Sequence, residues 1–345
     1  MNIYEKDIFS QADDMRGVLE NFLKEDYVTV ISDIKKNVFK KIIFTGMGSS
    51  YFACYNAVTI LRNNGIECYA ISASQLLHYE LPSIERNTLV VIVSQSGRSG
   101  EIVELVEKIK RRYFILGISN DKESPLGICS DCMLNLFLES ELSVSTRTYL
   151  APIMLLYIFA RVISGLWSES DILNIKGTID SLEESVQEFE RISGKLEEFF
   201  AIPPVINLLG RGYSLSTVDC GALFINEVAK YPSRSYDTGQ FRHGPYEIIN
   251  KDFNAFVFAP KDNTYQMQVR MAREIAGKGG KVALITDGME ESENNILVIR
   301  QKYPLPELVD MINIVPVQAF GNYIAKRKGL EVGVFLYSSK VTNIQ

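Results

Sequence analysis

Short apolar runs alternate with amphipathic segments along most of the chain. The runs are almost uninterrupted, as in LVVIV at residues 89–93, and a segment with helical spacing follows most of them. Uninterrupted apolar runs are typical of strands that are buried on both faces. Strands that alternate with helices form βαβ units around a parallel sheet. The pattern therefore predicts the α/β class.

The same order of elements occurs twice. Gly46 and Gly48, in the loop after the first strand run, lie 164 positions before Gly210 and Gly212, which follow a second such run. We therefore predict two doubly wound parallel-sheet domains of the flavodoxin-like type in tandem, each with about five strands. The predicted organisation is an N-terminal helical segment at residues 1–30, a first domain at 31–167, a helical linker at 168–200 and a second domain at 201–345.

Three segments have helical patterns of their own. Tyr149–Trp167 is apolar enough to imitate a membrane span, but it contains Pro152 and Arg161. A charge near the middle of a span is costly, so we expect a buried core helix. In the linker, apolar residues between 179 and 189 are spaced by three and four, which predicts an amphipathic helix. Another helix is expected over Ile8–Leu23.

The composition argues against several classes of protein. The 345 residues are 46% hydrophobic and 23% charged, which is typical of globular domains. A net charge of -6 gives no electrostatic basis for binding nucleic acid or an anionic membrane. The first residues are charged, so no secretory signal is expected. Five cysteines, an odd number, argue against a disulfide framework and favour the cytoplasm.

Neither a metal site nor a dinucleotide site is expected. The chain has two histidines and no dense carboxylate cluster, and the lone CxxC at Cys129 and Cys132 lacks a second pair. The loops GMGSSY and GRGYSL begin with G-x-G but lack the third glycine of a dinucleotide fingerprint. We therefore expect no cofactor.

Three loops of the first half are rich in serine and glycine or threonine: GMGSSY, SQSGRSGE and SVSTRTY. In open parallel sheets, ligands bind beyond the carboxyl ends of the strands. Glycines let the backbone approach an anion, and free amides at a helix N-terminus favour a phosphate. Such residues also make ordinary turns and caps. We expect one phosphate to be surrounded by Ser49, Ser50, Ser94, Gln95, Ser96 and Ser99.

Several motifs resemble those of the sugar isomerase (SIS) family. SQSGRSGE at residues 94–101 resembles the phosphosugar loop of that family. GALFINE ends at Glu227, which lies sixteen positions before the His243 of GQFRHGP, and Lys340 lies a few residues from the C-terminus. In order and spacing, these motifs are similar to those of double-SIS phosphosugar enzymes, such as the isomerase part of glucosamine-6-phosphate synthase and the fructosamine-6-phosphate deglycases.

The resemblance implies roles for three residues. It implies that Glu227 moves a proton between C1 and C2 of a sugar phosphate, that His243 assists ring opening, and that Lys340 orients the ring oxygen. In the family the histidine often comes from the neighbouring subunit, so a homodimer or higher homo-oligomer is expected. The chemistry fits, because proton transfer next to a carbonyl or imine needs a carboxylate within reach and imidazole titrates in the useful range. Each residue taken singly is also a common surface or loop residue.

The chain also departs from the synthase pattern. No nucleophilic Cys follows Met1 and no glutaminase segment precedes the first domain, so glutamine is not expected to be the nitrogen source. Phe224 and Asn226 stand where the synthase has Lys. The resemblance implies a phosphosugar isomerase, deglycase or deaminase that acts on a 6-phosphorylated ketosamine or amino sugar. Two alternatives stay open: an ammonia-dependent amino-sugar-phosphate synthase, and a sugar-phosphate sensor without catalysis.

Overall fold

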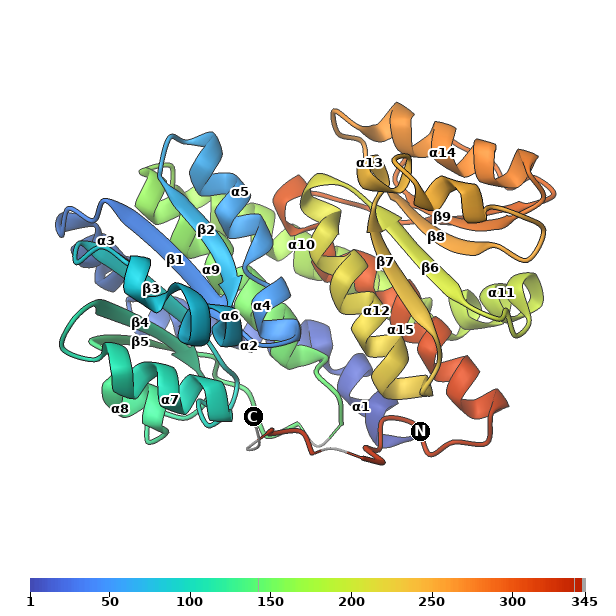
Figure 1. Ribbon diagram of the computed structural model, residues 1–345. Coiled ribbons are helices and arrows are strands. Elements are labelled where there is room, and N and C mark those ends of the chain that lie inside the picture. Colours follow the sequence, from blue (N-terminus) through green and yellow to red (C-terminus); the bar gives the residue numbers. More distant parts are fainter. Residues whose placement is uncertain (142, 338, 343–345) are drawn as a thin grey trace. The chain divides into compact units, whose positions relative to one another are not determined.

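Parallel strands form two separate five-stranded sheets in the computed structural model, which describes residues 1–141, 143–337 and 339–342 (Figure 1). Contacts divide the chain into two units. The first unit contains Asp13–Ile172 and Phe335–Gln345, and the second contains Met1–Ala12 and Leu173–Val334. The predicted α/β class with two doubly wound parallel-sheet domains is confirmed, and the predicted domain boundaries stay a prediction.

The first sheet has the strand order β2-β1-β3-β4-β5, and every neighbouring pair is parallel. All six residues of β3 are buried, as its uninterrupted apolar run predicts. The strand order reverses between β1 and β3, so the ligand crevice of such a sheet opens beyond the carboxyl ends of these two strands. The strands are β1 (Lys41–Gly46), β2 (Cys68–Ser72), β3 (Thr88–Val93), β4 (Phe114–Ser119) and β5 (Cys132–Asn135).

Helices cover both faces of this sheet. One group of mutually packed helices contains α3 (Tyr27–Lys36), α5 (Tyr55–Asn63) and α9 (Arg147–Ser164), and the other contains α7 (Gly100–Ile109) and α8 (Pro125–Cys129). The remaining helices of the first unit are α2 (Gln11–Lys24), α4 (Ser49–Phe52), α6 (Ala73–Gln75), the π-helix η1 (Leu76–Glu80) and the 3₁₀-helix η2 (Leu81–Ser83). α7 buries an apolar face against the sheet, because its apolar residues recur at helical spacing.

α9 is the long apolar helix of the sequence. By length and composition it could cross a membrane, but 89% of it is buried inside the protein, including Pro152. Near its C-terminal end, Arg161 pairs with Asp171 at 2.9 Å, and the Tyr157 hydroxyl donates to the same carboxylate at 2.6 Å. The burial and these polar contacts agree with the predicted core helix.

The second sheet repeats the topology of the first. Its order is β10-β9-β8-β6-β7, so that β6 and β8 correspond to β1 and β3. The glycine correspondence is visible in the backbone, because Gly48 and Gly212 follow the first strand of their sheets and have φ angles of 52° and 56°. Positive φ favours glycine. The strands are β6 (Ile206–Gly210), β7 (Ser233–Asp237), β8 (Asn254–Ala259), β9 (Lys281–Thr286) and β10 (Ile296–Arg300).

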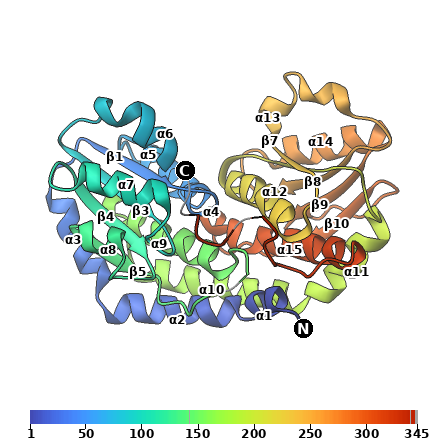
Figure 2. The same cartoon turned by 60° about the horizontal axis from the view of Figure 1, so that its bottom comes forward.

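Helices also flank the second sheet (Figure 2). α11 (Phe189–Phe200), α12 (Leu215–Ala229) and α15 (Asp310–Arg327) pack on one face, and α14 (Tyr265–Gly277) packs on the other. Gly221 allows α12 to lie close to its neighbours, since a Cβ there would be 2.6 Å from Leu208 Cδ2 and 3.1 Å from Val317 Cγ1. The remaining helices are α1 (Ile3–Phe9), α10 (Glu169–Gln187), α13 (Thr238–Phe241) and the 3₁₀-helices η3 (Gly212–Ser214), η4 (Pro245–Ile248) and η5 (Pro306–Leu308).

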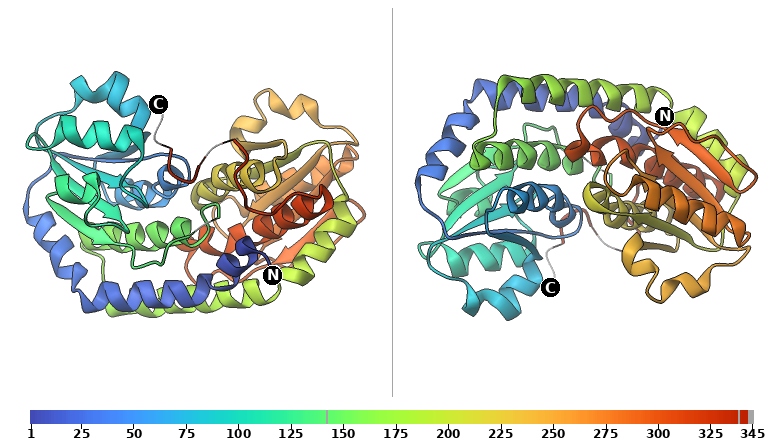
Figure 3. Two further views of the ribbon diagram at one scale, coloured as in Figure 1. Left: turned by 90° about the horizontal axis from the view of Figure 1, so that it is seen from below. Right: turned by 90° about the horizontal axis from the view of Figure 1, so that it is seen from above.

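Two helical segments are broken where the sequence predicts continuous helices. The N-terminal segment forms α1 and α2, which are separated by Ser10, and the linker forms α10 and α11, which are separated by Glu188 (Figure 3). Val186 and Phe189, on either side of the second break, are both buried. The hydrophobic phase continues through the break, which is why the pattern alone predicts one helix.

A polar network fixes α1 and Gln11, the first residue of α2, to α15 within the second unit. Glu5 accepts hydrogen bonds from Asn322 at 3.0 Å and from Lys326 at 2.5 Å. The side-chain amides of Gln11 and Gln318 exchange hydrogen bonds of 3.1 and 3.2 Å. These contacts join positions that lie 307 to 321 residues apart in the sequence.

Candidate active site

The loops after β1 and β3 begin side by side. Gly46 at the end of β1 pairs with Val93 at the end of β3 in parallel register. The first loop leads into α4, whose first residues are Ser49 and Ser50, and the second loop begins at Ser94. The predicted phosphate-binding residues of both loops therefore follow the two strands that flank the switch point of the first sheet.

The β3 loop, residues 94–99, has a shape that requires glycine. Ser94 is buried, and its Oγ accepts a hydrogen bond from Gly97 N–H at 3.1 Å. Gly97 has a φ of 63°, and a Cβ there would lie 2.1 Å from Ser124 Oγ. The loop ends at Ser99, the N-cap residue of α7, whose side chain makes no capping hydrogen bond. A tight turn thus leads directly into a helix N-terminus, where anions are favoured.

The outer part of this loop is attached to the β4 loop. Ser96 Oγ accepts a hydrogen bond from Arg98 N–H at 3.2 Å, and the Arg98 guanidinium pairs with Asp121 at 2.7 Å. The Gln95 carbonyl accepts a hydrogen bond of 3.0 Å from Asn120 N–H. Because Asp121 takes the charge of Arg98, the groups that the loop offers to an anion are mainly hydroxyls and amides.

Glu141 is a buried carboxylate that caps α9. Its side chain has no exposed surface. Its Oε1 accepts hydrogen bonds from the N–H groups of Thr146 and Arg147 at 3.0 and 2.9 Å, and Thr148 Oγ1 donates to Oε2. The first amides of a helix have no partner within the helix and favour a negative charge. Glu141 therefore provides α9 with both a hydrogen-bond acceptor for its first amides and a negative charge near its N-terminus.

Lys340 reaches the same carboxylate from the C-terminal segment. Its Nζ donates hydrogen bonds to Glu141 Oε2 at 2.8 Å and to Ser143 O at 2.7 Å. Two residues further on, Thr342 O accepts a hydrogen bond of 3.1 Å from Gly100 N–H, in the first turn of α7. The C-terminal segment is therefore bound both to the loop before α9 and to the helix that follows the β3 loop.

Opposing effects act on the pKa of Glu141. Burial raises this pKa, but the charge and hydrogen bond of Lys340, together with the hydrogen bonds of Thr146 and Thr148, lower it by more. The pKa of Glu141 consequently lies below its ordinary value of 4.5. The ammonium of Lys340, whose side chain is 19% exposed, thus faces a carboxylate that is charged at neutral pH.

Glu227 lies near the C-terminal end of α12 in the second unit and is half-buried. The N-terminal end of this helix is fixed by buried Asp310, which accepts a hydrogen bond from Thr217 N–H at 2.8 Å. At the other end, Lys230 Nζ donates to the Glu227 carbonyl at 2.7 Å. Burial lowers the pKa of Lys230, and the negative charge of Glu227 opposes this effect. A carboxylate and an ammonium are therefore neighbours at this helix end.

His243 follows α13 in an exposed loop of the second unit. Its main-chain N–H donates to Gln240 O at 2.9 Å, and the next residue, Gly244, has a φ of 133°. The preceding Arg242 pairs with Glu274 at 2.9 Å. The backbone before and after His243 thus has a defined conformation, while the imidazole ring lies at the surface.

The predicted site residues fall into two groups. The six phosphate-binding candidates and the segment that carries Lys340 belong to the first unit, where Thr342 contacts α7, whereas Glu227 and His243 belong to the second. The sequence prediction missed Glu141. Its signal was one of two glutamates, Glu139 and Glu141, shortly before the hydroxyl-rich start of the long apolar helix. Among the described residues, no group of three or more His, Cys, Asp and Glu is placed to hold a metal ion.

Glycine turns, hydroxyl groups and a helix N-terminus at a switch point are features that occur in α/β proteins that bind phosphorylated ligands. Residues 38–161 match the model of the SIS domain. The match covers all five strands of the first sheet and confirms the resemblance that the motifs of the sequence predict.

Known proteins are similar over nearly the whole chain. The chain is 26% identical over 333 residues to the isomerizing glutamine–fructose-6-phosphate aminotransferase of Pyrococcus horikoshii, which covers 94% of this chain and 54% of that protein. The chain thus spans about half the length of the curated relatives it matches.

Solved structures share the fold. The C-terminal domain of glucosamine-fructose-6-phosphate aminotransferase from Francisella tularensis matches with a TM-score of 0.86 at 21% identity, covering 96% of this chain and 98% of that chain. Glucosamine-6-phosphate deaminase from Thermotoga maritima matches with a TM-score of 0.76 at 21% identity, covering 99% of each chain.

Proposed function

We propose that this protein is a phosphosugar enzyme of the isomerase and deglycase type. It acts on a 6-phosphorylated ketosamine or amino sugar by moving a proton between C1 and C2. The observation that carries this proposal is the placement of two serine-rich loops at the switch point of the first sheet, with the Lys340 segment bound to α7 at the end of one of them.

The substrate phosphate would be held by neutral donors. The residues proposed for this role are Ser49, Ser50, Ser94, Gln95, Ser96 and Ser99. Hydroxyl groups, glycine-loop amides and a helix N-terminus can hold a phosphate without a free cation. The pairing of Arg98 with Asp121 leaves this mode of binding as the one that the loop supports.

Three residues would carry the chemistry. Glu227 would take a proton from C1 of the open-chain ketosamine and return it to C2, which converts the C1 amine into an imine that water hydrolyses to a sugar phosphate and a free amine. His243 would move the proton between the anomeric hydroxyl, which is O2 in a ketosamine and O1 in an aldose, and the ring oxygen during ring opening. Lys340, whose ammonium is held by a buried carboxylate, is suited to donate a hydrogen bond to the ring oxygen.

An oligomer and a cytoplasmic location form part of the proposal. His243 lies at the surface on a loop that a main-chain hydrogen bond holds in place, which suits a role in the site of a neighbouring subunit. We propose a homodimer or a higher homo-oligomer for this reason. The five free cysteines fit a reducing compartment.

Deamination or ammonia-dependent synthesis of an amino sugar phosphate is a second candidate. The similarity to the Thermotoga deaminase, over 99% of both chains, favours it. The proton transfer would be the same, and the amine released or taken up would be ammonia. A sensor without catalysis would keep the phosphate loops and would not need Glu227.

One experiment separates these functions. The protein is incubated with a panel of 6-phosphorylated ketosamines, amino sugars and ketoses. Release of an amino acid or other amine identifies a deglycase, release of ammonia a deaminase, and formation of only an aldose phosphate an isomerase. Saturable binding without any turnover or proton exchange would instead identify a sensor and refute the proposed catalysis.

A further inference from the structure

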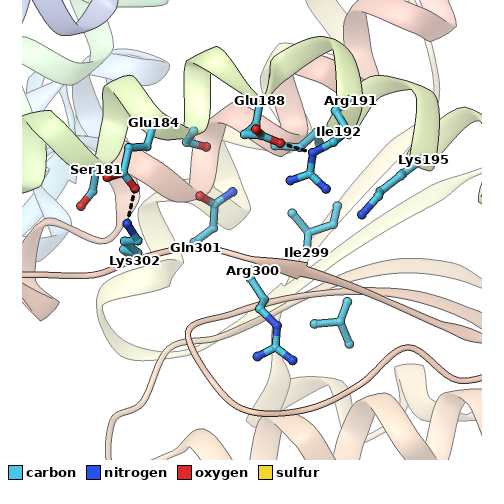
Figure 4. Close-up of a pocket in the computed structure, with 12 residues that line it drawn as sticks. Ser181, Glu184, Glu188, Arg191, Ile192, Lys195, Ile299, Arg300, Gln301 and Lys302 are labelled. Carbon is cyan, nitrogen blue, oxygen red and sulfur yellow. Dashed lines mark hydrogen bonds and ion pairs between the residues drawn. The ribbon is translucent and has the colours of Figure 1, made fainter.

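A hollow of about 460 Å³ lies in the second unit, between helices α10 and α11 and the end of β10 (Figure 4). β10 is the edge strand of its sheet, whereas the switch point of that sheet lies between β6 and β8. The hollow is therefore outside the position where a sheet of this kind holds its usual ligand. Its volume is in the range of sites for small metabolites.

Cations outnumber carboxylates on the walls of this hollow. Four cations and two carboxylates line it, which leaves an excess of two positive charges. Both carboxylates are already neutralised, since Glu184 pairs with Lys302 at 2.6 Å and Glu188 pairs with Arg191. The walls consequently attract an anion.

Lys195 is the cation available to a ligand. Arg300 is occupied, because its guanidinium donates to the carbonyls of Gly288 and Glu290 at 2.6 and 2.8 Å. Within the part of the chain that the structure describes, the Lys195 ammonium makes no ion pair or hydrogen bond. Figure 4 shows Lys195 reaching from α11 toward the strand.

Two buried polar groups on the walls also lack partners. Ser185 on α10 is 4% exposed and Gln301, just after β10, is 8% exposed. Ser185 Oγ and Gln301 Nε2 have no hydrogen-bond partner among the described residues. The Gln301 amide points from the strand toward the two helices (Figure 4). Buried polar groups are nearly always paired in native proteins. On the walls of this hollow, however, a buried hydroxyl and a buried amide lack an acceptor from the chain, and the ammonium of Lys195 lies on the same walls.

We propose that this hollow is a second binding site, which takes a small metabolite through a carboxylate or phosphate group. An anionic oxygen group accepts hydrogen bonds from Gln301 and Ser185 and pairs with Lys195. Charge-assisted hydrogen bonds of this kind are about twice as strong as neutral ones. The site does not depend on the proposed phosphosugar chemistry, because none of its residues lies in the loops of the first sheet.

Anion soaking and titration locate the site. Crystals are soaked with tungstate, whose anomalous signal marks each bound anion, and the intact protein is titrated with inorganic phosphate and with citrate. Phosphate is also expected at the β3 loop, so the titrations are repeated with the Ser96→Ala variant. We expect a tungstate peak between Lys195 and Gln301, and saturable binding of at least one of the two anions to the Ser96→Ala protein. Binding of phosphate alone identifies a phosphate ligand, and binding of citrate alone a carboxylate.

Substitutions on the walls test the donors. Gln301→Leu and Lys195→Ala should each weaken anion binding in the hollow by about tenfold, which corresponds to the loss of one charge-assisted hydrogen bond. Lys176→Ala serves as the control, because Lys176 is exposed on α10 but does not line the hollow. The substitution Gln301→Leu removes a buried donor that has no partner. In the absence of anions, the melting temperature of this variant should therefore be equal to or higher than that of the parent protein.

Two results would overturn the proposal. One is the absence of tungstate from the hollow together with no binding of phosphate or citrate to the Ser96→Ala protein, which would mean that water alone fills the space. The other is anion binding there that Gln301→Leu and Lys195→Ala leave unchanged, which would mean an adventitious ion only. Loss of phosphate binding at the β3 loop alone would bear on the phosphosugar proposal and would leave this one standing.

Discussion

Lys340 and Glu141 are 199 positions apart in the sequence, and a 2.8 Å contact joins the ammonium of one to the buried carboxylate of the other. The carboxylate is also held by the first amides of α9, so its position is fixed by a helix. The place of Lys340 in the first unit therefore depends on a residue that never needs to touch a substrate. Glu141 acts as a positioning residue for Lys340 and its segment.

Glu141→Gln should reduce turnover more than substrate affinity. The amide still accepts hydrogen bonds from the α9 amides but no longer pairs with the Lys340 charge. We expect kcat for the phosphosugar reaction to fall at least about tenfold and the free energy of unfolding to fall by about 1–3 kcal/mol. Steady-state kinetics and urea unfolding measure both effects. Glu139→Gln is the matched control, because Glu139 is exposed two residues away. Equal effects of the two variants would contradict the positioning role.

The stability contributed by Glu141 should depend on pH. The folded-state pKa of Glu141 lies below its ordinary value of 4.5, so the folded state binds fewer protons than the unfolded state in this range. The contribution is therefore complete above pH 4.5 and is lost as the pH falls through the lower folded-state pKa. The difference in unfolding free energy between the parent and Glu141→Gln should shrink below pH 4.5. A difference that stays constant on both sides of this pH would show that the charge is not responsible.

Gly97→Ala should damage the β3 loop. A Cβ at this position would meet Ser124 at 2.1 Å, and the backbone has a positive φ. We expect a loss of about 1–3 kcal/mol in stability and weaker binding of sugar phosphates. Gly194→Ala on α11 is the control, because a Cβ there meets nothing within 4 Å. It should stabilise the protein by about 0.5–1 kcal/mol. Thermal and urea unfolding measure the stability of both variants. A change of stability in the same direction for the two substitutions would contradict this account.

Glu227→Gln should abolish most proton transfer. The amide keeps the shape of the side chain but accepts no proton, so exchange of solvent deuterium at C2 of a bound sugar phosphate should fall by about 10²-fold or more. Substrate affinity should change little. NMR of deuterium incorporation measures the exchange, and Glu291→Gln, at an exposed position of the same unit, serves as the control. Exchange at the parental rate would mean that another group is the base.

Mixed oligomers should recover activity if His243 serves a neighbouring subunit. Glu227→Gln and His243→Ala proteins should each be nearly inactive. After subunit exchange, some hybrid sites would receive both intact groups, so the mixture should regain part of the activity. Exchange can be followed with two affinity tags. Mixtures with proven exchange that stay as inactive as the single variants would place His243 in the site of its own chain.

The parallel strands were predictable because burial on both faces leaves an uninterrupted apolar run. All residues of β3 and β8 are buried, and both runs are readable in the sequence. The breaks at Ser10 and Glu188 were not predictable, because buried residues on both sides keep one helical phase. Periodicity reports which face is buried, and it carries little information on where a helix bends.

The site was predictable to the extent that local motifs describe it. Ser94 and Ser99 lie in one loop, as the motif suggests. Glu141 was not predictable, because its importance comes from a contact across 199 positions and from burial beside a helix N-terminus. In the sequence, Glu141 has the same local pattern as the exposed Glu139 two residues before it.

The attachment of α1 to α15 imposes an order on the making of this protein. Gln11 leaves the ribosome 307 residues before its partner Gln318. At 5–20 residues per second, this delay is roughly 15–60 s. During that time Glu5 of α1 and Gln11, the first residue of α2, lack the partners that they have in the folded protein. The first unit is also incomplete during this time, because Lys340 is made after the whole second unit. Neither unit can therefore be completed before Gln318 and Lys340 have been made, although most of the first sheet is available early.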